Sequence, residues 1–186
     1  MHKLSIIQNF FEVVDEKPLD LILTEIKTGY YAEEINILRK HLRYGHKGHF
    51  ENEKRTLPAF TPTGIFSVIE NELVLSNYSQ YILLDTGTLF PEQIEVASKK
   101  LQDEPCTLAY FKSPSCNSLK IIVEVNLAWA YYIESFLEVK EYYQKLLSTS
   151  IMNSERNIQN LCFISDDPDL YQNENHQIFQ IQRPDY

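Results

Sequence analysis

Side chains that could bind phosphate or a metal ion gather around one predicted strand end and one predicted turn. Asp85 ends the apolar run YILLD, while Ser113 and Ser115 lie in a polar turn that Lys120 follows closely. A carboxylate is a ligand for Mg²⁺, and serine hydroxyls, backbone N–H groups and a lysine ammonium group bind phosphate oxygens. The alternative for Asp85 is a cap on the turn after the strand, and the alternative for Lys120 is a solvated side chain beside an ordinary hairpin.

A basic segment at residues 39–55 is a second candidate, because it carries six Lys or Arg residues against two Glu. The whole chain has a net charge of -9, so a polyanionic partner should favour this segment and avoid the acidic residues 153–186. The predicted nucleic-acid patch consists of Arg39, Arg43, Lys47, Lys54 and Arg55. Three histidines share the segment, but no cysteine or acid completes a familiar zinc spacing.

Other polar groups lack the spacing of known sites. Asp166, Asp167 and Asp169 have neither the glycine nor the terminal glutamate of an EF-hand loop, and they indicate a turn. Three cysteines without a CxxC pair are typical of reduced thiols. Residues 1–11 lack the apolar region of a signal sequence, and no run is long enough to span a membrane. We therefore expect a cytoplasmic protein with no membrane contact and no cofactor, unless an active site holds Mg²⁺ or Mn²⁺.

Apolar periodicity predicts the elements that position these side chains. Strands are expected at residues 81–85, 106–111, 119–126 and 161–165, and amphipathic helices at 91–102 and 129–147. This β-α-β-β-α-β order predicts an α+β sheet core of the RRM-like or primase-like kind.

The chain is predicted to form one domain over residues 1–186, with its core at 77–186 and an accessory part at 1–66. In the accessory part we expect two helices, the second at about 31–43, then a polar loop at 44–53 and extended backbone at 57–66.

The predicted topology also orders the candidate residues in space. Right-handed crossovers make the first two strands of the core parallel, and likewise the last two. Asp85, the turn at 113–118 and Asn160 should then share one end of the sheet, with Asp166 and Asp167 at the other end. The strand at 81–85 should be central, between the strands at 119–126 and 161–165.

Six segments of the chain are similar to one family of bacterial mobile-element proteins. They are LSIIQNFFEV near the start, IKTGYY at 26–31, LPAFTPTGIF at 57–66, YILLDTGTL at 81–89, FKSPSCNSLKIIVEV at 111–125 and NLCFISDDPDLYQN at 160–173. On these segments the chain resembles the VirE N-terminal-like domain, which is related to the archaeo-eukaryotic primases. The resemblance implies a primase-like fold in a replication or mobilisation protein, with a helicase-like or ATPase protein of the same element as partner.

The same resemblance indicates that the catalytic positions have changed. Gly87 stands where the family has a second aspartate after Asp85, and Cys116 and Ser118 replace two glycines of its hairpin. Asn160 stands where the resemblance implies a phosphate-clamping arginine, and we expect it to join the hairpin serines and lysine as a ligand-binding residue. A single Asp leaves Mg²⁺ with most of its waters and holds it loosely, whereas nucleotidyl transfer needs two or more carboxylates.

We therefore expect a non-catalytic, primase-like binding module that binds a partner protein and, through the hairpin and the basic segment, nucleotide or nucleic acid. One alternative is an active metal-dependent nucleotidyltransferase, with Asp85 as a catalytic metal ligand and Mg²⁺ or Mn²⁺ as cofactor. Another is a purely structural protein-interaction domain. Acidic residues close to Asp85 would favour the enzyme, whereas a filled and uncharged site would favour the structural domain.

Overall fold

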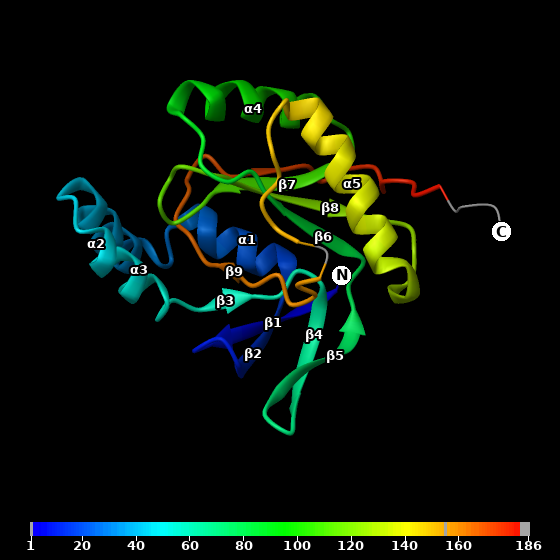
Figure 1. Cartoon of the computed structure of the whole chain (residues 1–186), viewed down its shortest axis with the longest axis horizontal. Helices are drawn as coiled ribbons and strands as arrows, with labels where there is room; N and C mark the ends of the chain where they lie inside the picture. Colours follow the sequence, from blue (N-terminus) through cyan, green and yellow to red (C-terminus); the bar gives the residue numbers. More distant parts are fainter. Residues whose placement is uncertain (1, 155, 183–186) are drawn as a thin grey trace.

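The computed structural model describes residues 2–154 and 156–182, which form a mixed α+β fold (Figure 1). The strands are β1 (Lys3–Gln8), β2 (Glu12–Pro18), β3 (Ala59–Phe60), β4 (Gly64–Ile69), β5 (Glu72–Tyr78), β6 (Tyr81–Asp85), β7 (Thr107–Lys112), β8 (Leu119–Glu124), β9 (Cys162–Phe163) and β10 (Tyr171–Gln172). The helices are α1 (Leu19–Thr28), α2 (Ala32–Arg43), α3 (Lys47–Lys54), α4 (Pro91–Asp103) and α5 (Tyr132–Leu147), with a 3₁₀ turn at Trp129–Tyr131. Within the described residues, no helix is both long enough and apolar enough to cross a membrane.

A sheet with the strand order β10–β7–β8–β6 lies at the centre of the molecule. β8 pairs antiparallel with both β6 and β7, so β6 and β7 run in the same direction, as predicted. In this register Asp85 lies directly opposite Lys120. The runs YILLD and LKIIVE are largely buried because the sheet is covered on both faces, which is why neither run alternates cleanly between polar and apolar residues.

Two layers cover the central sheet. Helices α4 and α5 pack on one face, where Leu84 of β6 joins a buried cluster with Phe136 of α5 (Figure 1). Helix α1 and a second sheet pack on the other face, where Leu83 clusters with Ile26 and Phe60. Because these last two residues belong to the first third of the chain, the predicted accessory part and the predicted core share one hydrophobic cluster.

The second sheet has the strand order β2–β1–β3–β9, and its pairs are antiparallel. Helices α2 and α3 form a pair at one side of the molecule, held by Ile35, Leu38 and Phe50, which pack against Ile164 just after β9. β4 and β5 form a hairpin that projects from the body of the molecule (Figure 1).

The predicted helices are confirmed, and the extended backbone predicted at 57–66 contains β3 and the start of β4, whereas β1 and β2 were not expected. Helix α1 begins after Pro18 and ends at Gly29, whose φ of 76° is the left-handed conformation that favours glycine. β1 and β2 form a hairpin before this helix. The polar loop predicted at 44–53 is wrong, because most of it is helix α3, which is anchored by the single buried residue Phe50.

The central position predicted for the strand Tyr81–Asp85 is also wrong. β6 is an edge strand that pairs with β8 alone in the part of the chain that the structure describes. The fourth predicted strand is reduced to the two residues of β9, and β9 pairs with β3 in the second sheet. Cys162 thereby enters the cluster of α1 and Phe60. An apolar run predicts that a strand will be buried, but it does not specify the neighbour on which the strand packs.

Candidate functional site

A pocket of about 490 Å³ opens between α3, the end of β6 and the hairpin that joins β7 to β8. Three lysines line it, together with two carboxylates and the serines of the hairpin. They are Lys47, Glu51 and Lys54 from α3, Asp85 from β6, Ser113, Ser115 and Ser118 from the hairpin, and Lys120 from β8. The pocket therefore unites residues from the predicted metal site, the predicted phosphate site and the predicted basic patch.

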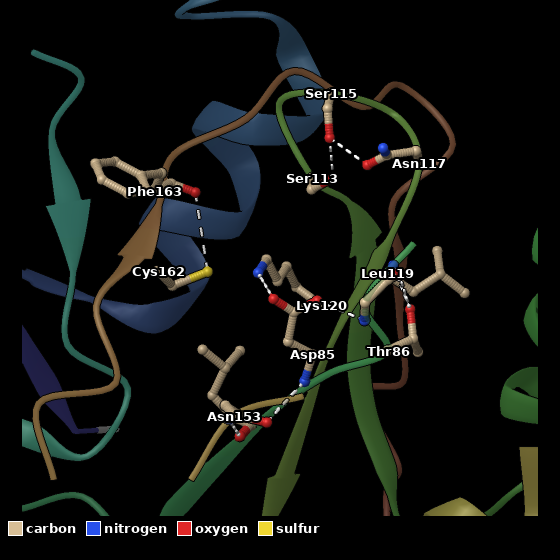
Figure 2. Close-up of polar contacts among 12 residues, drawn as sticks. Asp85, Thr86, Ser113, Ser115, Asn117, Leu119, Lys120, Asn153, Cys162 and Phe163 are labelled. Carbon is tan, nitrogen blue, oxygen red and sulfur yellow. Dashed lines mark hydrogen bonds and ion pairs between the residues drawn. The ribbon is translucent and has the colours of Figure 1, made fainter. Parts of the chain in front are cut away.

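Asp85 and Lys120 form an ion pair on the wall of this pocket (Figure 2). The pair follows from strand register, since side chains directly opposite each other in antiparallel strands lie close together on one face. The Lys120 side chain is 16% exposed and the Asp85 side chain 26%, so water shields their charges only partly. A lysine ammonium group in such a position is a strong donor to an anion, and here a carboxylate already accepts from it.

The other carboxylate oxygen of Asp85 caps the turn after β6. Its Oδ1 accepts a hydrogen bond from the backbone N–H of Gly87 at 3.1 Å. The capping role proposed as the alternative for Asp85 is therefore present. Thr86 ties the same turn to β8, because its hydroxyl accepts from the N–H of Leu119 at 3.0 Å and its own N–H donates to the Leu119 carbonyl at 3.1 Å. Both oxygens of Asp85 thus have protein partners before any ligand enters.

Asn153, which no sequence pattern singled out, closes the free edge of β6 (Figure 2). Its Oδ1 accepts from the N–H of Asp85 at 3.0 Å, and its Nδ2 donates to the carbonyl of Leu83. The neighbouring N–H of Met152 donates to the Asp85 carbonyl at 2.7 Å. One side-chain amide therefore replaces the donor and the acceptor of a missing strand. It lies 68 residues from Asp85, so no local signal could have located it.

The β7–β8 hairpin is held in shape by its own polar groups. The N–H of Ser113 donates to the Ser118 carbonyl at 2.9 Å, and the N–H of Cys116 donates to the Ser113 carbonyl at 2.8 Å. The hydroxyl of Ser115 hydrogen-bonds to that of Ser113 at 3.1 Å and also to the side chain of Asn117 (Figure 2). Cys116 has a φ of 59°, so the hairpin keeps a glycine-type backbone at one position where the resemblance implies glycine.

The cysteines near the pocket are not activated thiols. Burial raises the pKa of the Cys116 thiol, and this effect outweighs the opposing one of the Arg39 guanidinium. Burial also raises the pKa of Cys162, which lies beside the ion pair, to about 12 (Figure 2). Both thiols are therefore protonated at neutral pH and are poor nucleophiles.

Two of the five predicted basic residues line the pocket. Lys47 and Lys54 face it from α3, and the ammonium group of Lys54 also lies 5.4 Å from the centroid of the Phe163 ring. Arg43 and Arg55 are exposed but are not among the residues that line the pocket.

Arg39, the fifth predicted basic residue, bonds to the protein itself. Its Nε donates to the carbonyl of Pro114 at 3.1 Å, while its two terminal nitrogens donate to the carboxylate of Asp166 at 3.2 Å and to the Asp166 carbonyl at 2.6 Å. This one guanidinium group joins α2, the β7–β8 hairpin and the segment after β9.

The predicted separation of Asp166 and Asp167 from the hairpin is wrong. Arg39 links Asp166 to the hairpin, and Oδ2 of Asp167 accepts from the N–H of Lys112, the last residue of β7, at 2.8 Å. Asn160 lies elsewhere, since its Nδ2 donates to the Tyr132 hydroxyl at 2.8 Å and it does not line the pocket. The predicted positions assumed that this strand pairs in the central sheet, whereas β9 pairs with β3 in the second sheet.

Metal ligands do not converge in the part of the chain that the structure describes, where no three His, Cys, Asp or Glu side chains are placed to hold an ion. The rings of His41, His46 and His49 lie near one another, with centroids 5.5 to 6.3 Å apart, and His41 hydrogen-bonds to Glu53 at 3.1 Å. Around Asp85 the donors do not fit a two-metal centre, because its carboxylate is bonded to a lysine and to a backbone N–H.

A larger pocket, of about 950 Å³, lies between α4 and β7. Leu89 and Ile94 contribute apolar walls, and its Lys112 is paired with Asp167 at 3.4 Å and Asp169 at 2.9 Å. These charges largely neutralise one another, and none of the predicted phosphate-binding residues lines this pocket. The candidate site is therefore the smaller pocket.

Residues 52–171 match the protein family described as BT4734-like, N-terminal domain. The match covers more than half of the chain and includes β6, the β7–β8 hairpin and β8. No curated protein and no solved structure matches the chain.

Proposed function

This chain belongs to the BT4734-like N-terminal domain family, and we propose that it is a non-catalytic, primase-like binding module of a mobile-element replication or mobilisation system. It binds a helicase-like or ATPase partner protein of the same element, and its smaller pocket binds phosphate groups of nucleotide or nucleic acid. The observation that carries the proposal is the pocket itself, which is lined by three lysines and by a carboxylate that is already paired with one of them.

The primase-like part of the proposal rests on the resemblance to the VirE N-terminal-like domain and on strand order. The first three strands of the predicted core lie in the order β6–β8–β7, which is the arrangement expected for three of the four strands of a split βαβ fold. Helices α4 and α5 lie on one face of that sheet, as the predicted order requires. The fourth strand departs from the arrangement by joining the second sheet.

The absence of catalysis is proposed from the chemistry around Asp85. Phosphoryl transfer needs metal ions bridged by several carboxylates, and among the described residues the one other acid that lines the pocket is Glu51 of α3. Glu51 lies 4.0 Å from the ammonium group of Lys54. Each acid of the pocket thus has a lysine near it, which favours binding of an anion by exchange of partners and disfavours a metal cluster.

The proposal is tested by the binding of a fluorescent single-stranded oligonucleotide, measured by anisotropy as a function of salt. We expect weak binding that falls steeply between about 50 and 200 mM salt, because phosphate contacts release counterions. The double substitution Lys47→Glu and Lys54→Glu should abolish it. The matched control is Lys99→Glu with Lys145→Glu, which makes the same charge change on exposed positions of α4 and α5. Equal loss in both double variants would mean that net charge, and not this pocket, governs binding.

A primer-synthesis assay with Mg²⁺ or Mn²⁺ separates the proposal from its alternatives. We expect no nucleotide incorporation by the wild-type chain. Synthesis that disappears in Asp85→Ala would establish the nucleotidyltransferase instead. No binding of nucleotide or oligonucleotide at any salt concentration, together with binding to the partner protein, would favour the purely structural interaction domain.

A further inference from the structure

The smaller pocket already contains an anion, namely the carboxylate of Asp85 on the ammonium group of Lys120. A phosphate that enters the pocket either binds without contacting Lys120 or replaces the Asp85 carboxylate as the acceptor of the Lys120 ammonium group. Lys47 and Lys54 of α3 also line the pocket and are further contacts for an entering phosphate, and Glu51 lies 4.0 Å from the ammonium group of Lys54. Taken together, the five charged side chains of the pocket give an excess of a single positive charge.

We propose that Asp85 acts as a built-in competitor, which makes the pocket selective for multiply charged phosphate chains over singly charged or small anions. The inference rests on the proposed phosphate-binding function of the same pocket. A small anion gains little free energy by displacing Asp85 from Lys120, because it replaces one charge-assisted contact by another. A diphosphate or triphosphate chain reaches Lys120 while also contacting the α3 lysines, so it gains contacts that the carboxylate cannot provide.

The exchange requires little rearrangement of the protein. Oδ1 of Asp85 accepts from the N–H of Gly87, and this bond does not involve the lysine. The backbone of Asp85 is fixed separately by Asn153 and Met152. Lys120 is the mobile partner, since an ammonium group on a flexible stem can rotate from one acceptor to another without loss of geometry. Asp85 therefore remains in the turn as the lysine turns to the ligand.

The competitor role and a metal-ligand role predict opposite effects of the same substitution. If Asp85 held a metal for a nucleotide, Asp85→Asn would weaken phosphate binding in the presence of Mg²⁺. If Asp85 competes for Lys120, Asp85→Asn strengthens phosphate binding in the absence of any divalent cation. Asparagine keeps the shape of the side chain and the oxygen that caps Gly87, so the substitution removes the charge selectively.

The experiment is isothermal titration calorimetry of the full chain in EDTA, with inorganic pyrophosphate and inorganic phosphate as separate probes. We expect the wild type to bind pyrophosphate and to bind phosphate much more weakly. Asp85→Asn should bind pyrophosphate about tenfold more tightly, the effect of one charge-assisted contact. The gain should be larger for phosphate, so that the preference for the longer anion shrinks. Asp169→Asn is the matched control, because it also removes an Asp paired with a lysine but lies outside this pocket.

The outcomes separate this inference from the function on which it rests. Unchanged or weaker pyrophosphate binding by Asp85→Asn, with binding by the wild type that depends on Lys47 and Lys54, overturns the competitor role alone. Binding of neither anion by either protein overturns both. Circular dichroism and thermal melting check that the variant is folded. If it is not, Asp85→Ser carries the same test, since a serine hydroxyl can also cap the turn.

Discussion

Met152 lies directly against Gly87, in the space that a larger residue at that position would need. A Cβ atom added to Gly87 would collide with Cγ of Met152 and lie 3.2 Å from its Sδ. Gly87 also has a φ of 66°, a left-handed conformation that residues with a side chain adopt at a cost. A side chain at the position where the family resemblance implies a second aspartate would thus adopt a strained backbone conformation and would displace the Met152 side chain, which is 67% exposed.

Substitution of Gly87 should therefore destabilise the fold without creating a metal site. We expect Gly87→Ala and Gly87→Asp each to lower the free energy of unfolding by about 1–3 kcal/mol, measured by urea denaturation. Gly48→Ala is the control, because Gly48 lies in α3 with no atom near its added Cβ. That substitution should be neutral or stabilising by up to about 1 kcal/mol, since glycine is unfavourable inside a helix. Tight Mg²⁺ binding by a stable Gly87→Asp protein would contradict this account.

Loss of the Asn153 side chain should expose the edge of β6. Asn153→Ala removes one acceptor and one donor, and we expect it to lower the free energy of unfolding by about 1–3 kcal/mol. The more specific readout is amide hydrogen exchange, in which the N–H of Asp85 should lose protection while the N–H groups between β7 and β8 keep theirs. Asn175→Ala, at an exposed position, is the control. Equal protection of Asp85 in both variants would show that Asn153 does not cover the strand.

Arg39 should act on stability and not on nucleic-acid binding. Arg39→Met removes the bonds to Pro114 and Asp166 and leaves a carboxylate that is only 12% exposed without its cation. We expect a loss of about 2–3 kcal/mol in the free energy of unfolding, with oligonucleotide affinity unchanged below the melting temperature. Lys40→Met, at the adjacent exposed position of α2, should leave the stability nearly unchanged. A loss of oligonucleotide binding by a folded Arg39→Met protein would show that Arg39 contributes to nucleic-acid binding, as the sequence predicted.

The protein should lose stability at alkaline pH through its buried tyrosines. Burial raises the pKa of Tyr81 to about 12, whereas an unfolded tyrosine titrates near 10. Between these values the unfolded chain releases the proton and the folded chain does not, so the free energy of unfolding falls as pH rises through this window. Tyr81 alone should account for roughly 2–3 kcal/mol by pH 12.

Urea denaturation at several pH values from 9 to about 12 measures this effect. The fall should be shallower in Tyr81→Phe, whereas Tyr30→Phe, at an exposed position, should follow the wild type. A wild-type curve that stays flat through this window would show that Tyr81 is accessible to water in the folded state.

The parts of the site that follow from nearest-neighbour strand pairing could be predicted from the sequence. Two apolar runs joined by a short polar turn imply a hairpin, and the position of Asp85 at the end of YILLD brought it to the same end as the turn. The remaining parts depend on tertiary packing that leaves no periodic pattern. Helix α3 contributes two lysines to the pocket, yet its eight residues contain only one buried side chain, Phe50, so its sequence resembles a polar loop.

The partner of the fourth predicted strand also depends on tertiary packing and could not be predicted from its sequence pattern. The apolar run at residues 161–165 correctly indicated burial of Cys162, but burial against α1 and Phe60 serves the hydrophobic effect as well as burial beside β6 would. Because β9 pairs in the other sheet, Asn160 lies away from the pocket, and Asp166 and Asp167 lie beside the hairpin. A single change of strand partner thus reversed three of the predicted positions.

The pairing of β3 with β9 also has a consequence for the order in which the molecule folds. Ala59 pairs with Phe163, so the sheet that contains the first strand of the chain is completed by residues roughly a hundred positions further on. During synthesis β1 and α1 leave the ribosome long before this partner exists, and their apolar side chains stay uncovered until β6 to β9 have been made. We therefore expect the N-terminal third to fold late, after the strands on which it packs. Until then its apolar side chains are exposed, and in this period we expect chaperones to bind the chain.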